Sequence, residues 1–192
     1  ALGLVSKMPS GPGVLAWNTI AEIAATIPPG IASFLLTSSQ DATSIIAEQR
    51  MTKANTIQIV DELIDGDYQE IRTALPGIGI VQVIHVSDNS ALDEALRIAP
   101  HVDALLLDSG QPNADKKTLG GTGNAHDWHV SADIVKKVNK PVYLAGGLKP
   151  ENIEEAIRLV CPFGVDVCSG LRVNSRLDGE RLRLFCQKVM NT

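Results

Sequence analysis

The sequence predicts an α/β fold, a TIM (β/α)8-type barrel whose first strand and helix are missing from the chain as given. Short apolar segments alternate with segments of helical periodicity along the 192 residues, as expected of a parallel sheet covered by helices. Glycine-rich and polar stretches follow several of the apolar segments. A barrel builds its active site from the loops after many strands, whereas an open sheet gathers its ligand at one switch point. Seven strands can be counted instead of eight, which indicates a barrel that lacks one unit.

Seven apolar segments are the candidate strands. Each is short and almost entirely apolar, which is typical of strands that are buried on both faces. In chain order these segments are residues 1–5, 31–37, 56–60, 80–86, 104–108, 142–146 and 164–169.

Three further stretches carry apolar residues at the i, i+3, i+4, i+7 spacing of an amphipathic helix. The first stretch follows the first strand, the second precedes the last strand, and the third ends the chain. Their apolar residues are Ile20, Ile23, Ala24 and Ile27, then Ile153, Ala156, Ile157 and Val160, then Leu182, Phe185, Cys186 and Val189. We therefore expect residues 1–192 to form a single barrel domain that contains strands two to eight of a complete barrel.

Composition and charge argue against several classes of partner. The formal net charge is −5 and aromatic residues make up only 4% of the chain, whereas nucleic acids and anionic membranes attract basic surfaces. We expect no nucleic-acid partner and no membrane partner. Cys161, Cys168 and Cys186 are odd in number and lack the spacing of a metal site, which favours a cytoplasmic protein without a bound metal. The sequence is compatible with a monomer or a homodimer.

Two loops have the residues of a phosphate-binding site. Gly146 and Gly147 lie between a predicted strand and a predicted helix, where paired glycines expose backbone N–H groups and the helix dipole adds positive charge. Ser169, Gly170 and Arg172 follow the last predicted strand in the same way. Barrels commonly bind phosphate with the loops after their seventh and eighth strands, although each glycine motif alone is equally typical of a simple turn.

Asp108 is the candidate catalytic residue. It ends the segment 104–108 directly after three leucines, so it is expected at the mouth of the barrel, where partial burial can tune a carboxyl group for proton transfer. An isolated aspartate in such a place would more simply be a helix cap or a brace for a loop.

Three ordered motifs resemble the phosphoribosylanthranilate isomerase family of tryptophan biosynthesis. They follow Asp108 and Ser109, and weaker similarity extends over the whole chain. The matching residues are Gly120, Gly121, Thr122, Gly123, Asp127 and Trp128, then Gly146, Gly147, Leu148, Pro150 and Asn152, then Gly164, Val165, Asp166, Ser169 and Gly170.

This resemblance implies an Amadori rearrangement of N-(5-phosphoribosyl)anthranilate, without a metal or an organic cofactor. Asp108 occupies the position of the family's general acid, which protonates the ribose ring oxygen. The loop with Gly121 would cover the site and Asp166 would lie near the substrate. The phosphate group would be bound by the residues Gly146, Gly147, Ser169 and Gly170.

The chain departs from the family pattern in its first half. The family's general base is a cysteine in a Lys-Ile-Cys-Gly motif on the first strand, which is absent here, so we expect a further strand and helix ahead of Ala1. Cys168 shares a strand face with Asp166, but we expect it to have a packing role and not to replace that base. Lys7 aligns near an arginine of the family that can bind the substrate carboxylate. Lys7 is a possible substrate contact, but a lysine cannot form the two parallel hydrogen bonds that an arginine forms with a carboxylate.

Gln58 begins a Gln-Ile-Val sequence where the family often has Gln-Leu-His, and we regard it as a possible substrate contact. His85 is either a site residue or a core histidine whose hydrogen bonds are satisfied, and we favour the second interpretation. Two alternatives to the isomerase stay open. One is a related phosphosugar isomerase with another substrate, and the other is a catalytically silent relative that binds a phosphorylated ligand.

Overall fold

The computed structural model describes residues 1–9, 13–109 and 128–192. Seven strands form one parallel sheet whose spatial order is the order of the chain. All seven overlap the predicted segments, but the last strand is much shorter than predicted, because it ends at Val165 and the residues 166–169 form a loop and the start of a 3-10 turn. They are β1 (Leu2–Val5), β2 (Ser33–Thr37), β3 (Thr56–Ile59), β4 (Gly79–His85), β5 (Ala104–Asp108), β6 (Val142–Leu144) and β7 (Gly164–Val165).

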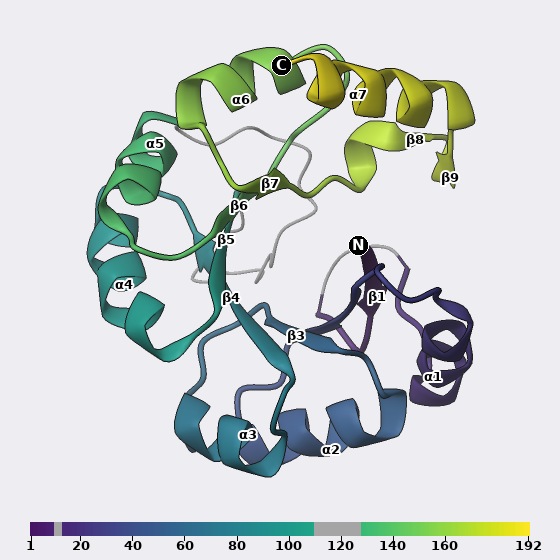
Figure 1. Cartoon of the computed structure of the whole chain (residues 1–192), viewed down its shortest axis with the longest axis vertical. Coiled ribbons are helices and arrows are strands. Elements are labelled where there is room, and N and C mark those ends of the chain that lie inside the picture. Colours follow the sequence, from purple (N-terminus) through teal and green to yellow (C-terminus); the bar gives the residue numbers. More distant parts are fainter. Residues whose placement is uncertain (10–12, 110–127) are drawn as a thin grey trace.

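Seven α-helices cover the convex side of this sheet (Figure 1). They include the three predicted helices and four that connect the remaining strands. The helices are α1 (Trp17–Thr26), α2 (Ala42–Thr52), α3 (Tyr68–Ala74), α4 (Ser90–Ile98), α5 (Trp128–Lys137), α6 (Ile153–Val160) and α7 (Gly179–Asn191).

The sheet curls into an arc, with α1 at one end and α7 at the other (Figure 1). Parallel pairing runs without interruption from β1 and β2 to β6 and β7. Within the described residues, β1 and β7 are not paired with each other. The predicted barrel-type fold is therefore confirmed as a curled sheet of seven strands that is open between its first and last strand.

Alternation along the strands divides the apolar residues into two layers. In β3 and the residue after it, Ile57 and Ile59 pack under the helices, whereas Val60 belongs to a second cluster inside the arc. In β5, Leu106 belongs to the inner cluster as well. Because side chains two positions apart share a face of a strand, Asp108 lies on the inner face at the end of β5.

The last part of the fold contains features that the sequence pattern did not predict. A 3-10 turn, η2 (Ser169–Leu171), leads into a small antiparallel hairpin of β8 (Arg172–Val173) and β9 (Arg176–Leu177). Helix α7 also differs from its predicted stripe, because Phe185 is buried but Leu182 is 37% exposed. Among the described residues, α7 is the last helix along the arc, with α6 beside it (Figure 1).

Candidate active site

The C-terminal ends of β5, β6 and β7 meet at a small cavity of about 60 Å³. Two loops contribute most of its wall: the β6 loop (residues 145–152) and the β7 loop (residues 166–171). The structure thus brings together five of the residues that the sequence indicated. These five lining residues are Asp108, Gly146, Gly147, Asp166 and Ser169.

Asp108 is half-buried at the end of β5 and faces this cavity. The backbone N–H of Ser109 donates a hydrogen bond of 2.7 Å to Oδ1 of Asp108, and this bond fixes the orientation of the carboxyl group. Its neighbour across the sheet is His85 of β4. A carboxyl group held in this way can deliver or accept a proton at a defined place.

Asp166 is the second carboxyl group of the cavity. Solvent reaches its side chain through the open mouth, yet the pKa of Asp166 is raised to about 6. The main cause is desolvation by the surrounding protein, and the second is the negative charge of Asp108, while a backbone hydrogen bond from Val167 acts in the opposite direction. The two carboxyl groups are therefore electrostatically coupled, and such a pair retains a proton at a higher pH than an isolated aspartate.

The β6 loop turns sharply at its two glycines. Gly146 has φ 82° and Gly147 has φ 66°, a region that residues with a side chain rarely adopt. The Asn152 side chain closes the turn, because its Nδ2 donates to the carbonyl of Gly147 (3.0 Å) and its Oδ1 accepts from the N–H of Lys149 (2.9 Å). Helix α6 begins directly afterwards, so the positive end of its dipole lies beside the loop.

The β7 loop rests on the β6 loop at Gly170. A Cβ atom at this position would overlap the backbone carbonyl of Leu148. Gly170 is therefore required for the close approach of the two loops. Arg172, which the sequence grouped with the phosphate-binding residues, lies in β8 instead, and its guanidinium donates to the carbonyl of Ser175 within the hairpin (3.1 Å).

The remaining predicted contacts lie elsewhere. Lys7 is exposed and lines a second cavity of about 570 Å³ at the ends of β1, β2 and β3. Gln58 of β3 is 5% exposed and lines neither of these two cavities. Gly121 lies outside the described residues. The structure therefore brings neither Lys7 nor Gln58 into the cavity that contains Asp108.

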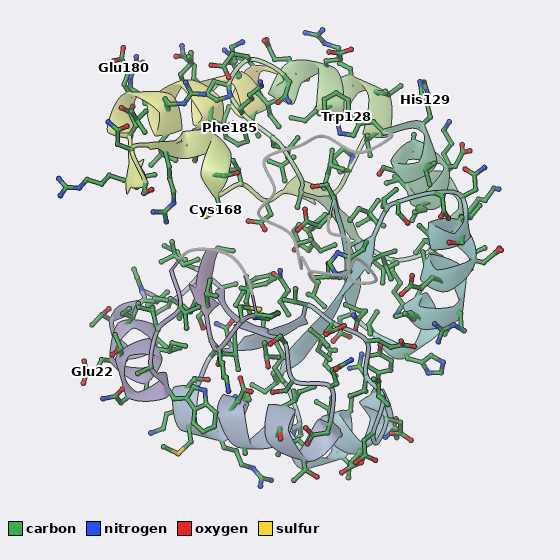
Figure 2. All side chains as sticks on the ribbon, turned by 180° about the vertical axis from the view of Figure 1, so that it is seen from behind. Glu22, Trp128, His129, Cys168, Glu180 and Phe185 are labelled. Carbon is green, nitrogen blue, oxygen red and sulfur yellow. The ribbon has the colours of Figure 1, made fainter. Side chains whose placement is uncertain are left out.

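The cysteines are not packing residues. All three are free and exposed, so the expectation of a packing role for Cys168 is wrong. Cys168 lines the cavity with Asp108, and Figure 2 shows it on the inner side of the arc. The reason is that β7 ends at Val165, so Cys168 lies in the β7 loop and not on the strand where a packing role was expected. In the described part of the chain, no group of three or more histidine, cysteine or acidic side chains is arranged to hold a metal ion.

The two ring nitrogens of His85 differ in their hydrogen bonding. Its Nε2 is 2.9 Å from the carbonyl of Val60, and because a carbonyl can only accept, this nitrogen carries the proton. The other nitrogen, Nδ1, is buried and has no hydrogen-bond partner among the residues that the structure describes. The interpretation that we favoured is thus correct for one ring nitrogen and wrong for the other.

Comparison with known proteins agrees with this arrangement. A family model described as N-(5'-phosphoribosyl)anthranilate (PRA) isomerase matches residues 35–188. The N-(5'-phosphoribosyl)anthranilate isomerase of Methanocella arvoryzae is 30% identical over 193 residues, which cover 100% of this chain and 88% of the relative.

Solved structures of the same family share the fold. The phosphoribosyl anthranilate isomerase from Thermococcus kodakaraensis has a TM-score of 0.78 and 29% identity, and the match covers 99% of this chain and 88% of that one. A phosphoribosyl anthranilate isomerase in complex with reduced 1-(o-carboxyphenylamino)-1-deoxyribulose 5-phosphate has a TM-score of 0.74 and 19% identity, with 99% and 86% covered. The motifs, the arc of parallel strands and these matches establish that the chain belongs to the N-(5'-phosphoribosyl)anthranilate isomerase family.

Proposed function

We propose that the chain converts N-(5-phosphoribosyl)anthranilate to 1-(2-carboxyphenylamino)-1-deoxyribulose 5-phosphate, an Amadori rearrangement of tryptophan biosynthesis. The observation that carries the proposal is one cavity lined both by the carboxyl groups of Asp108 and Asp166 and by two glycine loops. Acid catalysis and phosphate binding are the two requirements of this reaction, and the residues that we propose for them lie at neighbouring strand ends.

The phosphate end of the substrate binds to the β6 and β7 loops. Gly146 and Gly147 bring the backbone close to the ligand, and the first turn of α6 adds a favourable dipole for an anion. Ser169 contributes a hydroxyl group at the same cavity. Backbone and hydroxyl donors suit a phosphate group, since its oxygens accept several hydrogen bonds.

The ribose lies beside the two carboxyl groups. Asp108 acts as the general acid and protonates the ring oxygen, so that the bond between this oxygen and C1′ breaks and a Schiff base forms. Loss of the C2′ proton to a base gives an enolamine with a hydroxyl group at C2′. Protonation at C1′ and loss of the proton of this hydroxyl group then give the ketone. Asp166 supports the first step because its raised pKa keeps a proton in the pair at mildly acidic pH. No external oxidant or organic cofactor enters this sequence of steps.

The anthranilate end is assigned to the other side of the mouth. Lys7 lines the larger cavity there and offers a flexible ammonium group for the substrate carboxylate. Gln58 of β3 stays the second candidate contact, although its buried side chain lines neither cavity. We further propose a cytoplasmic location, as is usual for a biosynthetic enzyme that acts on a small phosphorylated metabolite, and a monomeric or homodimeric state. In the described residues, no helix has the length and apolarity to cross a bilayer.

The test follows the fluorescence of freshly prepared N-(5-phosphoribosyl)anthranilate as it is consumed. We expect Asp108→Asn to reduce kcat by about a hundredfold or more, because a positioned general acid contributes on that scale. Asp133→Asn is the matched control, since Asp133 lies on the surface of α5 with 61% of its side chain exposed.

Equal activity of Asp108→Asn and wild type would overturn the acid role of Asp108. A folded wild-type protein that binds inorganic phosphate without consuming the substrate would favour the two alternatives, a phosphosugar isomerase of different specificity or a silent binding protein. A folded wild-type protein that neither binds inorganic phosphate nor consumes the substrate would overturn the proposed phosphate site itself.

A further inference from the structure

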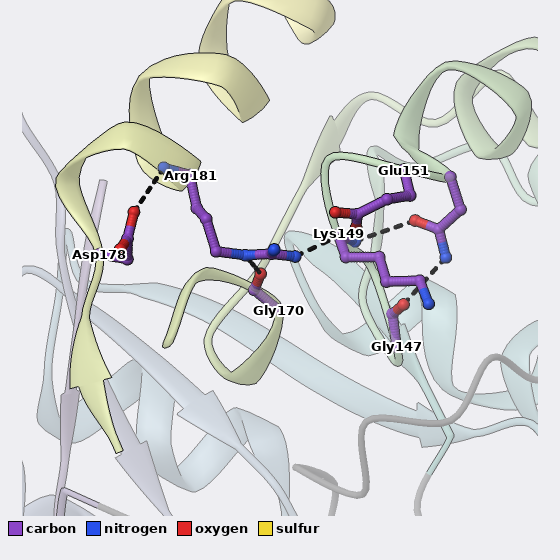
Figure 3. Close-up of polar contacts among 7 residues, drawn as sticks. Gly147, Lys149, Glu151, Gly170, Asp178 and Arg181 are labelled. Atoms are coloured by element: carbon purple, nitrogen blue, oxygen red, sulfur yellow. Dashed lines mark hydrogen bonds and ion pairs between the residues drawn. The ribbon is translucent and has the colours of Figure 1, made fainter. Parts of the chain in front are cut away.

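One arginine joins the two loops of the phosphate site from behind. Arg181 lies in the first turn of α7, and its Nε donates to the carbonyl of Gly170 in the β7 loop (3.0 Å). Its Nη2 forms an ion pair with Glu151 of the β6 loop (3.1 Å). Figure 3 shows the guanidinium between these two loops. A single side chain therefore contacts both walls of the cavity without lining it.

The place where Arg181 acts is one that needs support. The β7 loop touches the β6 loop at Gly170, where no Cβ would fit against Leu148. Glycine has more backbone freedom than any other residue. A tether on the carbonyl of Gly170 restricts this freedom, because the carbonyl and the following N–H share one rigid peptide plane.

The guanidinium is itself held in position. The N–H of Arg181 donates to Oδ1 of Asp178 (2.8 Å), which caps α7 and fixes the start of the helix. Across the site, Asn152 donates to the carbonyl of Gly147 in the β6 loop (3.0 Å). Each loop thus has one glycine carbonyl bonded to a side chain, and the ion pair of Arg181 with Glu151 connects the two arrangements.

We propose that Arg181 is a positioning residue of the phosphate site, which holds the β6 and β7 loops in register through Gly170 and Glu151 and does not touch the substrate. The inference rests on the proposed phosphate-binding role of these loops. Arginine suits this task because its planar guanidinium can donate to two acceptors at once, whereas lysine offers only one compact charge. Preformed loops bind an anion more tightly than loops that must be ordered on binding.

The experiment measures the Kd of inorganic phosphate by calorimetry, and KM and kcat with the natural substrate. We expect Arg181→Lys to raise Kd and KM about tenfold, the effect of losing a charge-assisted hydrogen bond, and to change kcat by less than about twofold. Because lysine keeps the positive charge, a purely electrostatic contribution of Arg181 to phosphate binding would survive this substitution. Glu151→Gln should raise Kd about threefold, since it removes only the exposed ion pair.

Two substitutions on the same helix are the controls. Arg183→Lys alters an exposed arginine two residues further on, whose guanidinium donates to Oε1 of Gln187 one turn along the same helix (3.5 Å). Lys188→Met breaks the ion pair of α7 with Glu154 on α6 (2.8 Å), which joins the helices without reaching either loop. Both should leave the Kd of phosphate unchanged.

An unchanged Kd in Arg181→Lys, with wild type binding phosphate, would overturn the inference and leave the phosphate site intact. Weaker binding in Lys188→Met equal to that in Arg181→Lys would also overturn it, because general helix packing would then explain both. A folded wild type that binds no phosphate would instead overturn the proposed phosphate site, and with it the role of Arg181.

Discussion

The two halves of the mouth of the sheet are built differently. At the ends of β5 to β7, glycines with positive φ, a backbone contact at Gly170 and a network of side-chain hydrogen bonds enclose a cavity of about 60 Å³. At the ends of β1 to β3 the cavity is about 570 Å³ and Lys7, on its wall, is exposed. Under the proposed function, the first half holds one small anion in one place and the second accepts groups of different size. Binding strength should therefore depend on the first half and substrate choice on the second.

The largest effect is expected where the backbones meet. Gly170→Ala introduces a Cβ that overlaps the carbonyl of Leu148, so one loop has to move. We expect a loss of about 1–3 kcal/mol in the free energy of unfolding, as for other overpacked sites, together with at least tenfold weaker phosphate binding. Thermal unfolding and phosphate calorimetry measure the two effects.

Gly179→Ala is the matched control, because nothing lies within 4 Å of a Cβ at the first residue of α7. It should leave phosphate binding unchanged and the stability equal or slightly higher. If Gly170→Ala behaved like Gly179→Ala, the loops of the β5 to β7 half would be adaptable and the contrast between the two halves would disappear.

The second prediction concerns the pH dependence of stability. The pKa of Asp166 is raised from 3.8 to about 6 in the folded chain, so the folded state keeps a proton that the unfolded state has released between these values. The contribution of Asp166 to the free energy of unfolding is therefore fully present below about pH 4 and is lost as the pH rises through 6. Asp166→Asn carries no such titration, and its stability relative to wild type should increase from pH 4 to pH 6 and then stay constant.

The measurement is Tm at pH 4, 5, 6 and 7 for wild type, Asp166→Asn and the surface variant Asp133→Asn. A stability difference between Asp166→Asn and wild type that does not change with pH would contradict the raised pKa. The same result would also contradict the electrostatic coupling of Asp166 with Asp108.

A smaller effect is expected at the other half of the mouth. Lys7→Met should raise KM about two- to fivefold without a comparable change in kcat, since an exposed, flexible ammonium group contributes little to binding. Lys136→Met, at a surface lysine of α5 with 73% of its side chain exposed, is the control. A hundredfold increase in KM in Lys7→Met would instead show that the β1 to β3 half binds the substrate as specifically as the β5 to β7 half.

The contrast also explains what could be predicted from the sequence. The seven strands and the residues Asp108, Gly146 and Gly147 depend on local patterns, namely apolar runs and glycines between a strand and a helix. The bond of Arg181 with Glu151 joins residues 30 positions apart, and no local pattern identifies it. Local patterns also do not reveal that Nδ1 of His85 lacks a partner among the described residues, because the ring is held by the bond of its other nitrogen to Val60, 25 positions earlier in the chain.

Local sequence patterns also did not predict which side chains are exposed at the ends of the arc. Cys168 and Leu182 belong to stretches whose patterns predict buried side chains, yet both are exposed in the structure. Cys168 lies in the loop after β7, and Leu182 lies on α7, the last helix of the described arc. A periodic pattern shows which face of an element is apolar, but it does not show whether a neighbour covers that face.

The smallest effect is expected at Cys168, which lines the tight cavity from its open side. Serine is nearly the same size, so Cys168→Ser should change kcat/KM by less than about twofold, within the range of well-tolerated isosteric substitutions. Iodoacetamide should nevertheless inactivate wild type and spare Cys168→Ser, because a carboxamidomethyl group at this position fills a cavity of about 60 Å³. Inorganic phosphate should slow the inactivation, while Cys161 and Cys186, which are exposed elsewhere, continue to react. Complete loss of activity in Cys168→Ser would contradict this prediction. It would indicate that the Cys168 thiol takes part in proton transfer and does not only line the cavity.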